Sequence, residues 1–165
     1  MKRIALVTDS TADLTAEMKR AFNVYTIPLK VRFAEQEFKD GELTPEEFYH
    51  RLAKGGPLPQ TSQPSPEEFR QLYRKLLVDH DAILSIHLSS ALSGTLNAAA
   101  LAKADFKQEI HLFDSKNISL GIGLLIKEAA RLIAEGLPLP QIIAELKKVR
   151  GQIVTLFTLT TLEYL

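Results

Sequence analysis

The chain has 165 residues, with 20 basic and 20 acidic side chains, so its formal net charge is zero. Apolar residues make up 45% and charged residues 24%, as in an ordinary globular domain, which excludes a disordered chain. The lack of a basic excess argues against a nucleic-acid-binding module, which needs cations to contact phosphates. With no cysteine, the sequence excludes a disulfide scaffold, a thiolate zinc site and a cysteine nucleophile.

Two features of the sequence bear on the subcellular location of the protein. The longest clearly apolar stretch, 118–126, is far shorter than the roughly 18 residues of a membrane-spanning helix. Met1-Lys2-Arg3 leads directly into the apolar run 4–7, without a signal-peptide cleavage site. We therefore expect a cytoplasmic protein with no stable membrane insertion.

Start signals divide the chain into helices and strands. Thr44–Glu47 and Ser65–Glu68 each offer an N-cap hydroxyl, a proline at the first helical position and a glutamate at the third. Ser10-x-x-Asp13 resembles a capping box for a helix reaching about Phe22, and Pro28 indicates an edge strand. The expected strands are 4–7, 24–33, 36–38, 82–87, 110–113 and 153–157. The expected helices end near 22, 54, 78, 103, 135 and 149, and 58–64 is expected to be a stiff polar loop.

This alternation of strands and helices predicts βαβ units, and hence an α/β fold with a parallel sheet covered by helices on both faces. We expect residues 1–165 to form a single α/β lobe. The end of the chain is unusual because 151–162 has no charged residue and 160–165 begins like a helix. Since termini are usually polar, the sequence indicates a chain that stops partway through a larger structure.

Three expected strand–helix junctions are rich in Ser, Thr, Gly and Asp, namely 8–13, 88–95 and 114–119. In a parallel sheet these loops lie at the carboxyl edge, where ligands bind. Each opens a helix whose N–H groups and dipole attract an anion, and the hydroxyls add hydrogen bonds. Together with Thr61-Ser62, the loops predict a site for a carboxylate or a phosphate. The alternative is that the hydroxyls only cap helices.

Enzyme signatures are mostly absent: the sequence has no Walker loop, complete dinucleotide fingerprint or nucleophile elbow. His87 could orient Ser89, although a structural histidine is the more typical interpretation. Asp9 and Asp114 both follow strands and could hold Mg²⁺ or act as a base, but turn and cap roles are more common. The alternative function is therefore a small α/β enzyme acting on a phosphorylated metabolite through Asp9 or Asp114.

Several of these segments together resemble the DegV family. They follow the family's order and span almost the whole chain, with Ala91 standing where a glycine is common. The matching motifs are Val7–Leu14, Thr61–Pro66, His87–Thr95, Asp114-Ser115 with Ser119-x-Gly121-x-Gly123, and Thr161–Leu165.

The resemblance implies a bacterial lipid-binding protein that encloses one long-chain fatty acid between two domains, with no metal or cofactor. Some members of the family present the carboxylate to a separate fatty acid kinase, which makes an acyl phosphate for phospholipid synthesis. The resemblance therefore implies that catalysis belongs to such a partner and not to this chain. Carried over by motif, the residues expected at the carboxylate are Thr61, Ser62, Ser93 and Gly94. Thr8, Asp9 and Ser10 are expected to line the same end.

Family members continue into a second α/β domain beyond a motif like Thr161–Leu165. We therefore expect this chain to be the N-terminal lobe alone, without the C-terminal domain. The face that would meet the missing domain is then expected to be apolar and prone to self-association.

Overall fold

The structure, a computed structural model, describes residues 2–158. Its main sheet has four parallel strands in the order β2-β1-β6-β7, which confirms the predicted α/β class. Consecutive side chains of a strand face opposite sides of the sheet, so both faces must be covered. The strands are β1 (Ile4–Asp9), β2 (Val24–Ile27), β6 (Ala82–His87) and β7 (Glu109–Asp114).

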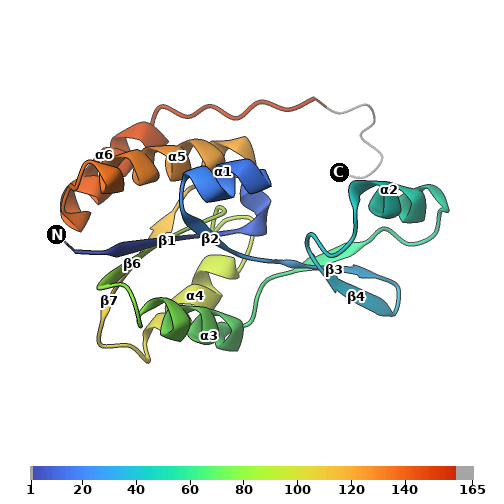
Figure 1. The fold of residues 1–165 in the computed structure, drawn as a ribbon. Helices are drawn as coiled ribbons and strands as arrows, with labels where there is room; N and C mark the ends of the chain where they lie inside the picture. The colour runs from blue at the N-terminus through green and yellow to red at the C-terminus, as the bar shows by residue number, and fades with distance from the viewer. Residues whose placement is uncertain (1, 159–165) are drawn as a thin grey trace.

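Helices cover both faces of this sheet, as predicted (Figure 1). On one face, Leu84 of β6 packs in a core with Ile126; on the other, Ile83 packs with Phe69. The helices of the first face are α1 (Ala16–Ala21), α5 (Leu120–Ala134) and α6 (Leu139–Arg150), and those of the second are α3 (Pro66–Leu76) and α4 (Thr95–Lys103). None of these helices is long and apolar enough to cross a bilayer within residues 2–158.

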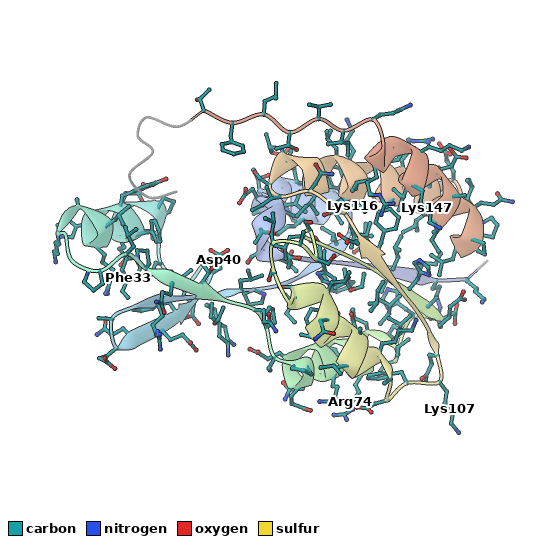
Figure 2. All side chains as sticks on the ribbon, turned by 180° about the vertical axis from the view of Figure 1, so that it is seen from behind. Phe33, Asp40, Arg74, Lys107, Lys116 and Lys147 are labelled. Atoms are coloured by element: carbon teal, nitrogen blue, oxygen red, sulfur yellow. The ribbon has the colours of Figure 1, made fainter. Side chains whose placement is uncertain are left out.

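The sequence is consistent with a hairpin of 24–33 and 36–38, but a separate antiparallel sheet was not predicted. Its strands β3 (Lys30–Phe33), β4 (Gln36–Lys39) and β5 (Gln60–Ser62) lie in the order β4-β3-β5, beside α2 (Pro45–Ala53). We call residues 30–62 the side unit, because they project from the side of the main sheet (Figure 1); Phe33 and Asp40 mark it in Figure 2. Within the described chain, neither hydrophobic core includes a residue of the side unit.

The side unit corrects two sequence predictions. The expected strand 24–33 is two strands in different sheets, because Pro28 has a fixed φ and no N–H to continue a ladder. Its first half, β2, is an edge strand of the main sheet, as the proline indicates. The expected loop 58–64 contains β5, whose residues pair with β3.

The predicted capping box at Ser10 and Asp13 is wrong. The Asp9 side chain instead caps a short 3₁₀ helix, η1 (Ser10–Ala12), by accepting the Thr11 N–H. Asp13 then adopts a left-handed conformation, with φ of 50°, which ends the turn. Aspartate tolerates this conformation better than most residues. The α-helix therefore begins only at Ala16, after the Thr15 cap.

The strand expected at 153–157 does not form. These residues have no regular structure and are largely exposed, with Leu156 at 88% and Phe157 at 77%. The Thr155 hydroxyl donates to Asn117 Oδ1 at 2.9 Å, so this segment is held by a side-chain contact. The expected helix start at 160–165, with its Thr161–Leu165 motif, lies outside the described residues.

Both strong capping boxes are confirmed. The Thr44 and Ser65 side chains accept the N–H of the residue three positions later, and Glu47 and Glu68 accept the N–H of the caps. Burial alone would raise the pKa of Glu68, but hydrogen bonds from Ser65 and the charge of Lys30 lower it. The two helices differ in burial, because α3 contributes core residues whereas α2 has no buried side chain.

We expect Ser65→Ala to lower the free energy of unfolding by about 1 kcal/mol, the usual cost of a lost N-cap. Thr44→Ala should cost clearly less, because α2 can fray without opening either core. Urea unfolding of the two variants checks this difference. Equal losses would contradict the separation of the side unit from the cores.

Candidate functional site

The carboxyl ends of β1, β6 and β7 meet at one edge of the sheet, as the sequence predicts. The parallel register brings Thr8 beside Ile86 and His87 beside Asp114. Backbone hydrogen bonds then join the loops that follow. They run from Ser89 N to Asn117 O and from Ser119 N to Thr11 O, both at 2.9 Å. The three hydroxyl-rich loops therefore form one connected surface.

The Asp9 carboxylate fastens two of these loops to each other. Its Oδ1 accepts the backbone N–H and the hydroxyl of Thr11, at 3.1 and 2.5 Å. Its Oδ2 accepts the Leu88 N–H at 3.0 Å and lies 2.9 Å from His87 Nδ1. Burial acts to raise the pKa of Asp9, but these hydrogen bonds and the His87 ring outweigh it and lower the pKa. The buried carboxylate is thus stabilised in its charged form.

A line of buried polar groups continues behind Asp9. His87 Nε2 lies 2.7 Å from Ser85 Oγ, which lies 2.9 Å from the Tyr73 hydroxyl. His87 therefore contacts Ser85 and Asp9 rather than orienting Ser89. The ionised Asp9 carboxylate can only accept, so His87 Nδ1 donates to it. Burial raises the pKa of Tyr73, so the phenol stays protonated.

Ser93 and Gly94 lie where loop 88–95 enters α4. Ser93 Oγ accepts the Thr95 N–H at 3.2 Å and is only partly buried. Gly94 is the N-cap residue and supplies no side-chain cap, so the first turn of α4 presents backbone N–H groups to the site edge. An acceptor atom at this edge would meet a hydroxyl and the positive end of the helix dipole.

Thr61 and Ser62 lie on β5, where they pair with Val31 and Lys30, and both are exposed. The next residue, Gln63, lies against Gly94: a Cβ added to the glycine would fall 2.1 Å from Gln63 Oε1. The side unit thus brings its hydroxyls next to the start of α4, so two motifs about 30 residues apart in sequence are neighbours here.

Thr8, Asp9 and Ser10 have a different setting from these exposed residues. Thr8 and Asp9 are 0% exposed, and among residues 2–158 the Thr8 hydroxyl has no hydrogen-bond partner. Ser10 Oγ accepts the N–H of Leu29, at the connection into the side unit. In this structure Thr8 and Asp9 are buried beneath the edge, Ser10 and Ser93 are half-buried, and the β5 hydroxyls are exposed.

Asp114 joins its own loop to loop 88–95. Its Oδ2 accepts the Ser90 hydroxyl at 2.6 Å, and its Oδ1 accepts the Lys116 N–H at 2.9 Å. Burial would raise the pKa of Asp114, but these bonds lower it. Asp9 and Asp114 end strands that β6 separates. Among the described residues no three His, Asp or Glu side chains gather in a metal-binding arrangement.

Exposed apolar side chains surround the same edge. Leu92 lies in loop 88–95, Ile118 in loop 114–119, and Leu120 and Leu124 in the first turns of α5. We call these four residues the apolar rim. The segment from Ile153 lies close by, since Val154 and Leu124 line one hollow. Hydroxyls and apolar surface therefore occur together.

Sequence reasoning missed Ser85, Tyr73 and Gln63. Ser85 carries a usable signal, because a serine inside the otherwise apolar run 82–86 needs a buried partner. Nothing in the local sequence identifies Tyr73 as that partner, since the contact joins α3 to β6.

We expect Asp9→Asn to lower the free energy of unfolding at pH 7 by about 1–3 kcal/mol, because buried donors lose a charged acceptor. The lowered pKa of Asp9 stabilises the fold above the unfolded pKa of about 4, and this contribution is lost as pH falls through the folded pKa. The difference from the wild type should therefore shrink below about pH 4.

Urea unfolding between pH 7 and pH 3 measures this difference. Asp13→Asn is the matched control, because Asp13 is exposed and asparagine tolerates its left-handed conformation. A difference that stays constant with pH would contradict the role assigned to Asp9.

Comparisons with known proteins identify relatives of this chain. Among curated relatives, a DegV domain-containing protein of Deinococcus radiodurans is 41% identical over 98% of this chain and 58% of its own length. Protein DegV of Bacillus subtilis is 38% identical over 98% of this chain and 59% of its own length. The chain thus spans less than two thirds of these relatives.

Solved structures show the same fold. A DegV family protein from Thermus thermophilus, described by its fatty acid binding, superposes with a TM-score of 0.85 at 39% identity, over 90% of this chain and 54% of that one. DegV of Bacillus subtilis, described as a fatty acid binding protein, superposes with a TM-score of 0.87 at 38% identity, over 92% of this chain and 55% of that one. The family model described as "Uncharacterised protein, DegV family" matches residues 3–165. This chain therefore belongs to the DegV family.

Proposed function

We propose that this chain is the lobe of a lipid-binding protein that holds the carboxylate of a long-chain fatty acid. The carboxylate would lie between the β5 hydroxyls of Thr61 and Ser62 and the start of α4 at Ser93 and Gly94. The observation that carries this proposal is the proximity of these two motifs, which Gln63 and Gly94 bring into contact. The description of similar proteins as fatty acid binding supports the choice of anion.

The chemistry of this edge suits a single carboxylate. Neutral hydroxyls and the N-terminal N–H groups of α4 stabilise a negative charge without an arginine clamp. The acidic side chains of the edge do not compete, because Asp9 and Asp114 already accept hydrogen bonds from residues of the neighbouring loops. Holding a ligand in this way needs no catalytic residue. The function that we propose is therefore that of a carrier rather than an enzyme.

The apolar rim offers the first contact for the acyl chain. Burying about fifteen methylenes gains on the order of 12 kcal/mol, at ~0.8 kcal/mol each. Association and ordering cost about 4–15 kcal/mol, so binding is tight only if most of the chain is covered. We propose that the part of the relatives beyond this chain supplies the second wall, and that a fatty acid kinase acts on the carboxylate held at the edge.

We expect Ser93→Ala and Thr61→Ala each to raise the Kd for palmitate by about 10- to 100-fold, the effect of one lost hydrogen bond to a charged group. Calorimetric titration of this chain with palmitate measures the change. Thr44→Ala is the matched control, because it removes a hydroxyl of the side unit that caps α2.

Unchanged affinity in Ser93→Ala and Thr61→Ala would contradict the assigned carboxylate site. Magnesium-dependent hydrolysis of a phosphate ester, abolished by Asp114→Asn or Asp9→Asn, would instead favour the enzyme alternative.

Because the apolar rim is uncovered in this lobe, we expect the chain to self-associate through it. Leu92→Ser with Leu120→Ser should shift the sedimentation profile towards the monomer, since these side chains are 64% and 69% exposed. Val78→Ser, which removes an equally exposed apolar side chain at the end of α3, is the control. A wild-type chain that remains monomeric at high concentration would contradict this expectation.

A further inference from the structure

Gly94 is a glycine for a reason of space. Its φ and ψ are −76° and 5°, a conformation open to any residue, so backbone freedom does not explain it. A Cβ at this position would lie 2.1, 2.8 and 2.9 Å from Oε1, Cδ and Nε2 of Gln63. The Gln63 carboxamide therefore packs directly on the Gly94 backbone, and a larger residue at position 94 would require the end of the Gln63 side chain to move.

Gln63 also lies at a junction of the fold. The side unit joins the rest of the chain through two crossings, residues 28–29 and 63–64, and each contains a proline. The side unit adds nothing to either core, so core packing does not set its position. Beyond the crossings, an ion pair between Lys30 and Glu68, at 3.6 Å, links it to α3.

These observations give Gln63 a defined role. We infer that Gln63 is a positioning residue, whose carboxamide on Gly94 fixes the side unit, and with it the hydroxyls of Thr61 and Ser62, relative to Ser93. The packing of the carboxamide on Gly94 is the contact that carries this role. The consequence for a bound carboxylate rests on the proposed function, whereas the contact itself needs no ligand.

The ligand-free protein gives the first test. Because the chain has no cysteine, His50→Cys on α2 and Lys103→Cys at the end of α4 can carry spin labels at exposed positions. Double electron–electron resonance then measures the distance between the side unit and the body. We expect one narrow distribution with Gln63 present and a broader one in Gln63→Ala.

Two variants sharpen this test. Gln60→Ala makes the same chemical change three residues earlier, on β5. Gln60 bonds Arg32 within the side unit, so this variant should leave the distribution narrow. Gln63→Glu keeps the shape of the side chain, and should keep the distribution narrow while its charge repels a bound carboxylate. Rescue by Glu but not by Ala identifies packing as the cause.

Gly94→Ala tests the contact from its other side. The added methyl group should displace Gln63 and broaden the distribution. Combining it with Gln63→Ala should add little, because the two side chains act through one contact. Independent, additive effects of the two substitutions would overturn the inference, as would a narrow distribution in Gln63→Ala.

Palmitate titration separates this inference from the proposed function. We expect the Kd to rise about tenfold in Gln63→Ala, because the two halves of the site are no longer held in place. If Gln63→Ala broadens the distance distribution but the wild type does not bind palmitate, the proposed function is overturned and the positioning role stands. Equal binding by wild type and Gln63→Ala, with both distributions narrow, would overturn the positioning role alone.

Discussion

The site edge depends on one buried carboxylate. Asp9 has no exposed surface, yet it accepts hydrogen bonds from Thr11 and Leu88 and contacts His87. A charge can be buried only when its oxygens are satisfied in this way, and these donors come from two different loops. Fixing the carboxylate therefore fixes the loops, and the start of α4 follows from the position of loop 88–95.

The surface of this edge combines hydrogen-bonding groups with exposed apolar side chains. The hydroxyls are those of Ser93 and of β5, and the backbone N–H groups are those of the first turn of α4. The side chains of the apolar rim lie on loops 88–95 and 114–119 and at the start of α5. An amphipathic ligand with a small anionic head satisfies both, whereas a phosphorylated sugar would leave the rim in water. The side unit contributes the hydroxyls of Thr61 and Ser62 to this surface, and within residues 2–158 it belongs to neither hydrophobic core.

Much of the fold was predictable because its signals are local. The capping boxes at Thr44 and Ser65 and the apolar strand 82–87 each depend on residues close in sequence. The failures depend on contacts that are distant in sequence. Ser10 was predicted to cap a helix, but Asp9, which is fixed by His87 and Leu88, caps the first turn instead. Segment 153–157 has the composition of a strand but no partner strand within residues 2–158. For the site, loop chemistry indicated the edge, but the packing of Gln63 on Gly94 joins segments that no local pattern connects.

The most direct test of the proposed site is a titration of isotopically labelled protein with palmitate carrying a ¹³C carboxyl group. We expect the carboxyl signal to shift on binding, and the amide resonances of Thr61, Ser62, Ser93 and Gly94 to shift together with it. Ser93→Ala should reduce both changes. Amide shifts confined to another surface, or no shift at saturating palmitate, would contradict the claim that this edge binds a fatty acid.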